Sequence, residues 1–103
     1  MFVKVYEYHI KKDKEADFIR IQEKSSEIYK KHLSCEVKYL KSINDETLWM
    51  EISEYSSEKE YLSGIQKVNK EPMIKELFSQ FQACLDSDKQ NIKESDYVLK
   101  LRI

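Results

Sequence analysis

The apolar pattern of this chain alternates between the two-residue period of β-strands and the 3.6-residue period of α-helices. The strand pattern covers residues 2–10, 36–43, 47–55 and 96–103, and the helical pattern covers residues 14–33 and the stretch between the last two strands. The resulting order, β-α-β-β-α-β, is typical of the ferredoxin-like α+β fold, an antiparallel four-stranded sheet with both helices on one face. A chain of 103 residues fits one such domain, spanning 1–103.

Local signals set the expected ends of these elements. Asp13 is a suitable N-cap for the first helix. Asn44–Asp45 supplies turn residues, so the strands on either side of it form a hairpin. Ser57 and Glu60 have the spacing of a capping box at the start of the next helix. Pro72 interrupts that helix and suits the first turn of another one.

The charge balance and the cysteines narrow the expected partners and compartment. The chain has 18 basic and 19 acidic residues, so its net charge of -1 gives no overall attraction for nucleic acid or anionic lipid. No segment reaches the roughly 18 consecutive apolar residues of a membrane span, and the first residues lack the pattern of a signal peptide. Cys35 and Cys84 lie far apart and are expected to be reduced thiols. We therefore expect a cytoplasmic protein that binds neither nucleic acid nor membrane.

The alternation of the third strand divides its residues between two faces. We expect Leu48, Met50 and Ile52 to face the helices, which leaves Trp49 and Glu51 on the opposite, open face. The first strand is apolar on both of its faces, and such a strand is usually covered on both sides. A symmetric homodimer would cover the open face by joining two sheets into a barrel.

The order of elements, the opening "KKDKEADF" after the first strand and the segment "EYSSEKEYL" resemble the dimeric α/β-barrel superfamily. The similarity extends over essentially the whole chain and is to the antibiotic-biosynthesis-monooxygenase-like branch, with NIPSNAP-like proteins nearby. It implies a homodimer, and in this group some members oxidise polycyclic aromatic substrates without a cofactor, some degrade haem and many have no known activity. Tyr55 falls where the family often has an aromatic residue. The haem-degrading branch has an asparagine in the first strand, and Tyr6 or Glu7 stands there instead, which disfavours haem degradation.

The predicted catalytic pair is His9 and Glu51. If His9 lies on the open face, it could meet Glu51 across the strands beside Trp49, and a histidine–carboxylate pair next to an aromatic wall suits proton abstraction from a phenol or enol. In the alternative interpretation Glu51 pairs with Lys100 or Arg102 and His9 is a solvated strand end.

The predicted substrate-binding residues are aromatic: Trp49, Tyr6 and Tyr55. The alternative is that the tyrosines fill the core while their hydroxyls reach water. His32 and Cys35 are too few for a zinc site, and no metal or cofactor is expected. The sequence thus predicts a small-molecule-binding protein resembling cofactor-independent monooxygenases, with an aromatic or enolic substrate in the barrel. The alternative is a non-catalytic homodimeric binding or structural protein.

Overall fold

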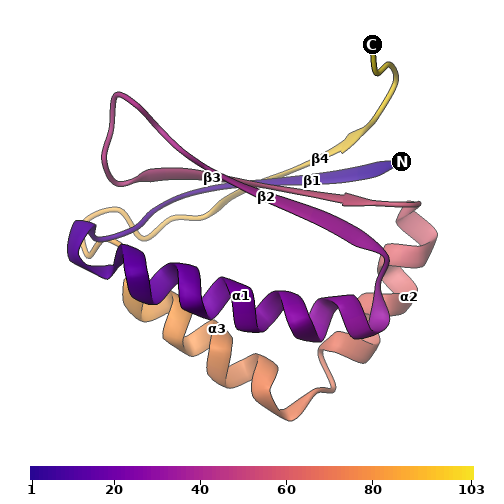
Figure 1. The fold of residues 1–103 in the computed structure, drawn as a ribbon, viewed down its shortest axis with the longest axis horizontal. Helices are drawn as coiled ribbons and strands as arrows, with labels where there is room; N and C mark the ends of the chain where they lie inside the picture. Colours follow the sequence, from indigo (N-terminus) through magenta and orange to yellow (C-terminus); the bar gives the residue numbers. More distant parts are fainter.

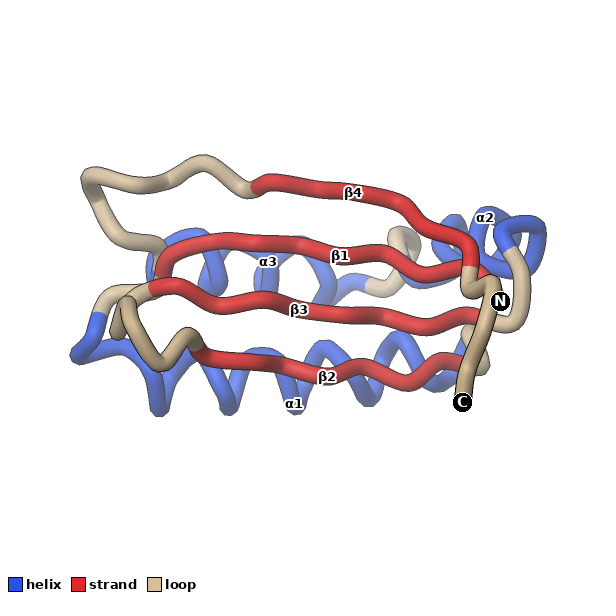
Figure 2. Tube along the Cα trace, turned by 90° about the horizontal axis from the view of Figure 1, so that it is seen from above, coloured by secondary structure: helices blue, strands red, loops and turns tan.

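A computed structural model describes all 103 residues of the chain. Strands β1 (Phe2–His9), β2 (Cys35–Lys41), β3 (Leu48–Tyr55) and β4 (Lys93–Val98) form one antiparallel sheet in the order β2-β3-β1-β4 (Figure 2). Helices α1 (Glu15–His32), α2 (Glu58–Val68) and α3 (Pro72–Cys84) all lie on one face of this sheet (Figure 1). A short 3-10 turn, η1 (Lys12–Lys14), precedes α1. The ferredoxin-like α+β fold is confirmed. None of the three helices combines the length and the apolar character that crossing a bilayer requires.

The helix starts follow the local signals in two cases of three. The Ser57 hydroxyl accepts a hydrogen bond of 3.1 Å from the Glu60 amide, as a capping box requires. Pro72 is the first residue of α3, where its fixed φ suits the helix. The prediction for Asp13 was wrong, because this residue lies within η1 and α1 begins after Lys14 without a side-chain cap.

The assignment of faces on β3 was wrong. Trp49, Ser53 and Tyr55 are buried beneath the helices, whereas the row that contains Met50 and Ile52 lies on the outer face. In the register of the sheet, Trp49 stands opposite Tyr8 of β1, so both rings point to the helix side. Since strand residues alternate, a one-residue error in face assignment moves every side chain of the strand. On β3, the row of side chains that contains the aromatic residues Trp49 and Tyr55 is the buried row.

The last strand also differs from the prediction. Val98 pairs with Phe2, which is the first residue of β1, and no strand pairing continues beyond this pair. Strand β4 therefore ends at Val98, and the side chain of Leu101 is 73% exposed instead of belonging to the core. The terminal segment crosses the ends of the strands (Figure 2), held by a 3.0 Å bond from the Leu99 amide to the Met1 carbonyl.

Two groups of aromatic rings pack between the sheet and the helices. The first, the Phe18 cluster, packs at ring-centroid distances of 4.9 to 6.1 Å around the buried Phe18 and consists of Tyr8, Phe18, Tyr39, Trp49 and Phe81. The second, the Tyr61 cluster, consists of Phe2, Tyr55 and Tyr61, with centroids 4.7 to 6.3 Å apart. Tilted and edge-on ring pairs of this kind add to the stability gained by burial.

Replacing Gly64 with alanine is expected to destabilise the fold. A methyl group at this buried position of α2 would overlap the Leu33 side chain, with Cγ at 2.7 Å, and would lie 3.0 Å from the His32 carbonyl oxygen. Overpacking typically costs about 1–3 kcal/mol, whereas the gain in helix propensity from glycine to alanine is about 1 kcal/mol. Urea unfolding should show a net loss. The control is Ser63→Ala at an exposed position of α2, which should be neutral or slightly stabilising; a Gly64→Ala protein as stable as this control would disprove the contact.

Candidate functional site

A cavity of about 350 Å³ lies between the sheet and the helices. Five tyrosines contribute to its wall, namely Tyr6, Tyr8, Tyr29, Tyr39 and Tyr55. Small side chains leave the space open: Ser25 and Ser26 come from the middle of α1, and Ser53 comes from β3 opposite. The volume falls within the range of small-molecule sites, roughly 300–1,000 Å³.

Glu51 is the only ionisable carboxyl in the interior part of this cavity. It is carried by β3, and its Oε1 accepts a 2.7 Å hydrogen bond from the Tyr8 hydroxyl, while no protein group donates to Oε2. Burial raises the pKa of the Glu51 carboxyl above its usual range, although the Tyr8 hydrogen bond opposes the shift. A carboxyl with a raised pKa is a stronger proton acceptor once ionised, as general acid–base catalysis requires.

The tyrosines of the cavity remain neutral hydrogen-bonding groups. Burial raises the pKa of Tyr29 to about 12, and it raises the pKa values of Tyr6, Tyr8, Tyr39 and Tyr55 still further. The Tyr39 hydroxyl donates a 2.9 Å bond to Oε1 of Gln22 on α1. This bond orients the Gln22 amide, so the NH₂ group remains free to donate to a ligand.

The cavity opens between α3 and the start of β4. Phe78 is 53% exposed and Ile92 is 37% exposed, and both line the cavity together with Glu94. Lys4 is buried beside this opening without lining it; its Nζ is 2.8 Å from Glu94 Oε2 and 2.6 Å from Asp96 Oδ1. Burial alone would lower the pKa of Lys4, but the hydrogen bonds to Asp96 and Glu94 outweigh it and the pKa is raised. Lys4 thus attaches β4 to the sheet.

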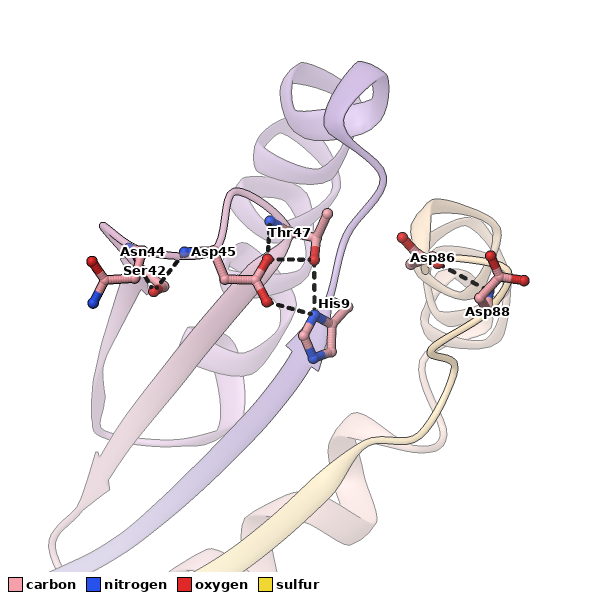
Figure 3. Close-up of polar contacts among 7 residues, drawn as sticks. All are labelled: His9, Ser42, Asn44, Asp45, Thr47, Asp86 and Asp88. Carbon is pink, nitrogen blue, oxygen red and sulfur yellow. Dashed lines mark hydrogen bonds and ion pairs between the residues drawn. The ribbon is translucent and has the colours of Figure 1, made fainter.

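His9 lies outside the cavity. Its neighbour Tyr8 points toward the helices, so His9 belongs to the outer row of β1, opposite Leu48. Figure 3 shows its ring turned toward the β2–β3 hairpin turn, where Nδ1 is 2.8 Å from the Thr47 hydroxyl. That hydroxyl donates to Asp45 Oδ1 at 2.9 Å, so its bond with His9 requires a proton on Nδ1. The histidine stabilises the turn, and the structure does not bring it together with Glu51.

Three of the five residues predicted for the site line the cavity: Glu51, Tyr6 and Tyr55. Trp49 belongs to the Phe18 cluster, with its ring 4.9 Å from that of Phe18, and His9 is on the other face. The cavity lies between the sheet and the helices of a single chain, and not on the open face, where the sequence predicts the substrate.

The predicted site did not include any residue of α1. Gln22 and Tyr29 line the cavity, and both stand on the helix face that follows Phe18, Ser25 and Ser26 at helical spacing. Polar residues on the sheet-facing side of a helix are a usable signal, because a simple core would have apolar residues there. No group of three or more histidine, cysteine, aspartate or glutamate side chains could hold a metal ion.

No family model matches the sequence, and no curated protein matches it either. Solved structures do resemble the fold. SnoaB, a cofactor-independent oxygenase from Streptomyces nogalater, superposes with a TM-score of 0.72 at 7% identity, over 99% of this chain and 95% of that one. An uncharacterised NIPSNAP domain protein from Burkholderia xenovorans gives 0.75 at 12% identity, over 97% and 95% of the chains. A candidate antibiotic biosynthesis monooxygenase from Nitrosomonas europaea gives 0.70 at 15% identity, over 95% and 97%. The structural neighbours thus include both antibiotic-biosynthesis-monooxygenase-like and NIPSNAP proteins.

Proposed function

We propose that the protein binds a small aromatic or enolic molecule in the cavity between sheet and helices, and that Glu51 removes a proton from it. One observation carries this proposal: a partly buried carboxylate faces a tyrosine-lined cavity with one oxygen held by Tyr8 and the other free. A phenol or enol hydroxyl would donate to Oε2, and the Gln22 amide would donate to a neighbouring carbonyl of the ligand. The aromatic walls provide stacking and edge contacts for a flat ligand.

The chemistry that follows would be an oxygenation without a cofactor, as in the oxygenase among the structural neighbours. Loss of the proton leaves an electron-rich enolate, which gives electrons to O₂. An activated methylene group then becomes a carbonyl, with one O₂ consumed and one water released. The role of the protein is to hold the substrate, accept the proton and exclude bulk water from the ionised intermediate.

Oxygen uptake with dithranol, a hydroxylated anthrone, tests this proposal. We expect the protein to increase O₂ consumption above the spontaneous rate, with one quinone formed for each O₂ consumed. Ser25→Phe, which fills the middle of the cavity from α1, should remove the increase without loss of the fold by circular dichroism. Uptake that is unaffected by Ser25→Phe would place any reaction outside the cavity.

A non-catalytic binding protein is the second candidate function. It is favoured by the NIPSNAP neighbour, which is uncharacterised, and by the neutral tyrosines that make up much of the cavity wall. The two candidates differ in one experiment: binding of dithranol without any increase in O₂ uptake would support the binding protein and reject the oxygenase.

The outer face of the sheet supports a homodimer, which we propose closes two sheets into a barrel. Apolar side chains from three strands share this face, and none of them is covered by a helix: Val3, Val5, Leu40, Met50 and Ile52. An uncovered apolar patch of this kind is typical of an interaction surface. A second copy presents the same patch, so a two-fold axis would bury both together.

Replacing Ile52 with lysine is expected to break the dimer, because Ile52 stands next to Val5 near the middle of the patch. Sedimentation velocity of the natural protein should give twice the 12.4 kDa of one chain, and Ile52→Lys should sediment as a monomer. The control is Gln66→Lys on the exposed side of α2, which adds the same charge and should remain dimeric. A natural protein that sediments as a monomer would refute the barrel.

A further inference from the structure

A row of four side chains crosses the sheet along the wall of the cavity. The register pairs Tyr39 with Glu51, Glu51 with Tyr6, and Tyr6 with Glu94, so the row contains one residue from each strand. All four line the cavity. Neighbouring strands lie about 4.8 Å apart, and β3 and β4 are both neighbours of β1, so the backbones at Glu51 and Glu94 are about 10 Å apart. Two carboxyls therefore flank the ring of Tyr6.

The charges that face the cavity are all acidic. No lysine, arginine or histidine lines it, and its tyrosines are neutral. The nearest buried cation, Lys4, is shared between Glu94 and Asp96, so one positive charge meets two negative ones at the opening. The Glu94 side chain is 54% exposed, and only its Oε2 is held by Lys4. The second oxygen remains available to a ligand at the opening.

We infer that the preferred ligand carries a cationic amine in addition to its phenol or enol group. The phenol would bind Glu51, its ring would lie against Tyr6, and the ammonium group would bind Glu94 at the opening. This assignment rests on the proposed function for the Glu51 end of the ligand. An ammonium group gains a charge-assisted hydrogen bond from the carboxylate and attraction from the aromatic faces. A carboxylate in the same place meets acidic groups and no available cation, so anionic ligands are rejected.

Three commercial probes that share a 4-hydroxyphenyl ring and a two-carbon side chain test the inference. They are tyramine, which is cationic, tyrosol, which is neutral, and 4-hydroxyphenylacetate, which is anionic. By calorimetric titration at neutral pH and low salt, tyramine should bind about tenfold more tightly than tyrosol, from one exposed ion pair together with cation–π contacts. The anion 4-hydroxyphenylacetate should bind more weakly than tyrosol.

The outcomes separate this inference from the proposed function. If tyrosol binds but tyramine is no tighter, or if 4-hydroxyphenylacetate is the tightest, the cationic preference is wrong and phenol binding stands. If none of the three binds, the proposed function fails together with the inference.

Two variants test whether Glu94 is the residue that causes the preference for tyramine over tyrosol. Glu94→Gln should reduce the advantage of tyramine over tyrosol to less than about threefold, since the ion pair is lost and only the aromatic contacts remain. Asp96→Asn is the matched control, because it removes the same charge and another partner of Lys4 at a residue that does not line the cavity. Asp96→Asn should keep the advantage of tyramine over tyrosol. An equal loss in both variants would attribute the preference to the general field of β4 and overturn the contact with Glu94.

Discussion

Glu51→Gln is expected to abolish most of the oxygenation of an enolisable aromatic substrate, with a fall in kcat of about 10²–10⁴-fold, the usual contribution of a general base. Glutamine keeps the shape of the side chain and can still accept the Tyr8 hydrogen bond, so the cavity should be unchanged. The two measurements on Glu51→Gln should therefore differ. Oxygen uptake should show that turnover is lost, whereas calorimetry should show that tyrosol binds only slightly more weakly. Full turnover in Glu51→Gln would remove this residue from the mechanism.

The same variant should change stability in a pH-dependent way. Because the pKa of Glu51 is higher in the folded than in the unfolded protein, its stabilising contribution is complete below the unfolded pKa and is lost as pH rises through the folded pKa. Each unit of difference between the two pKa values corresponds to about 1.4 kcal/mol. Glu51→Gln should therefore become more stable relative to the natural protein as pH increases from 4 to 8. An advantage that is constant or shrinks with pH would contradict the burial of an ionisable Glu51.

Phe18→Ala is expected to cause the largest loss of stability, about 3–5 kcal/mol, as for other buried phenylalanines. Phe18 is 1% exposed and is the centre of the Phe18 cluster, where its ring contacts those of Tyr8, Trp49 and Phe81. Removing it leaves a void that the rigid strands cannot close. Urea unfolding followed by Trp49 fluorescence measures this loss directly.

The matched control for this substitution is Phe78→Ala. Phe78 is on the same helix as Phe81 but is 53% exposed, so its removal should cost less than about 1 kcal/mol. Losses of equal size in the two variants would mean that the Phe18 cluster does not hold α1 and α3 to the sheet.

The order of elements could be predicted because each segment carries its own signal. The capping box at Ser57, the break at Pro72 and the turn at Asn44–Asp45 are local features, and the chain obeys them. The end of β4 is not local. It depends on the register between β1 and β4, which places Val98 opposite Phe2, the first residue of β1, and only the assembled sheet determines that register.

The sequence names some of the residues that line the cavity, but it does not predict where the cavity lies. Glu51, Tyr6 and Tyr55 are among the predicted residues and line the cavity, but both faces of β1 and β3 contain apolar residues, so hydrophobicity alone does not distinguish the two faces. The face of β3 that becomes buried is decided by the packing of Trp49 against Phe18, two rings that are far apart in sequence. Likewise, the small pair Ser25–Ser26 suggests a close approach of α1 to the sheet, whereas these serines leave the space that becomes the cavity.

Methyl-resolved NMR during titration with tyrosol would test most directly whether the cavity between sheet and helices is the ligand site. Methyl groups of Val37, Ile74 and Leu77 line the cavity, while those of Val5 and Ile52 lie on the outer face of the same sheet. We expect the first three to shift together with a single binding constant while the outer pair stays in place. Shifts confined to Val5 and Ile52 would show that the ligand binds the open face, and the proposed role of Glu51 would be wrong.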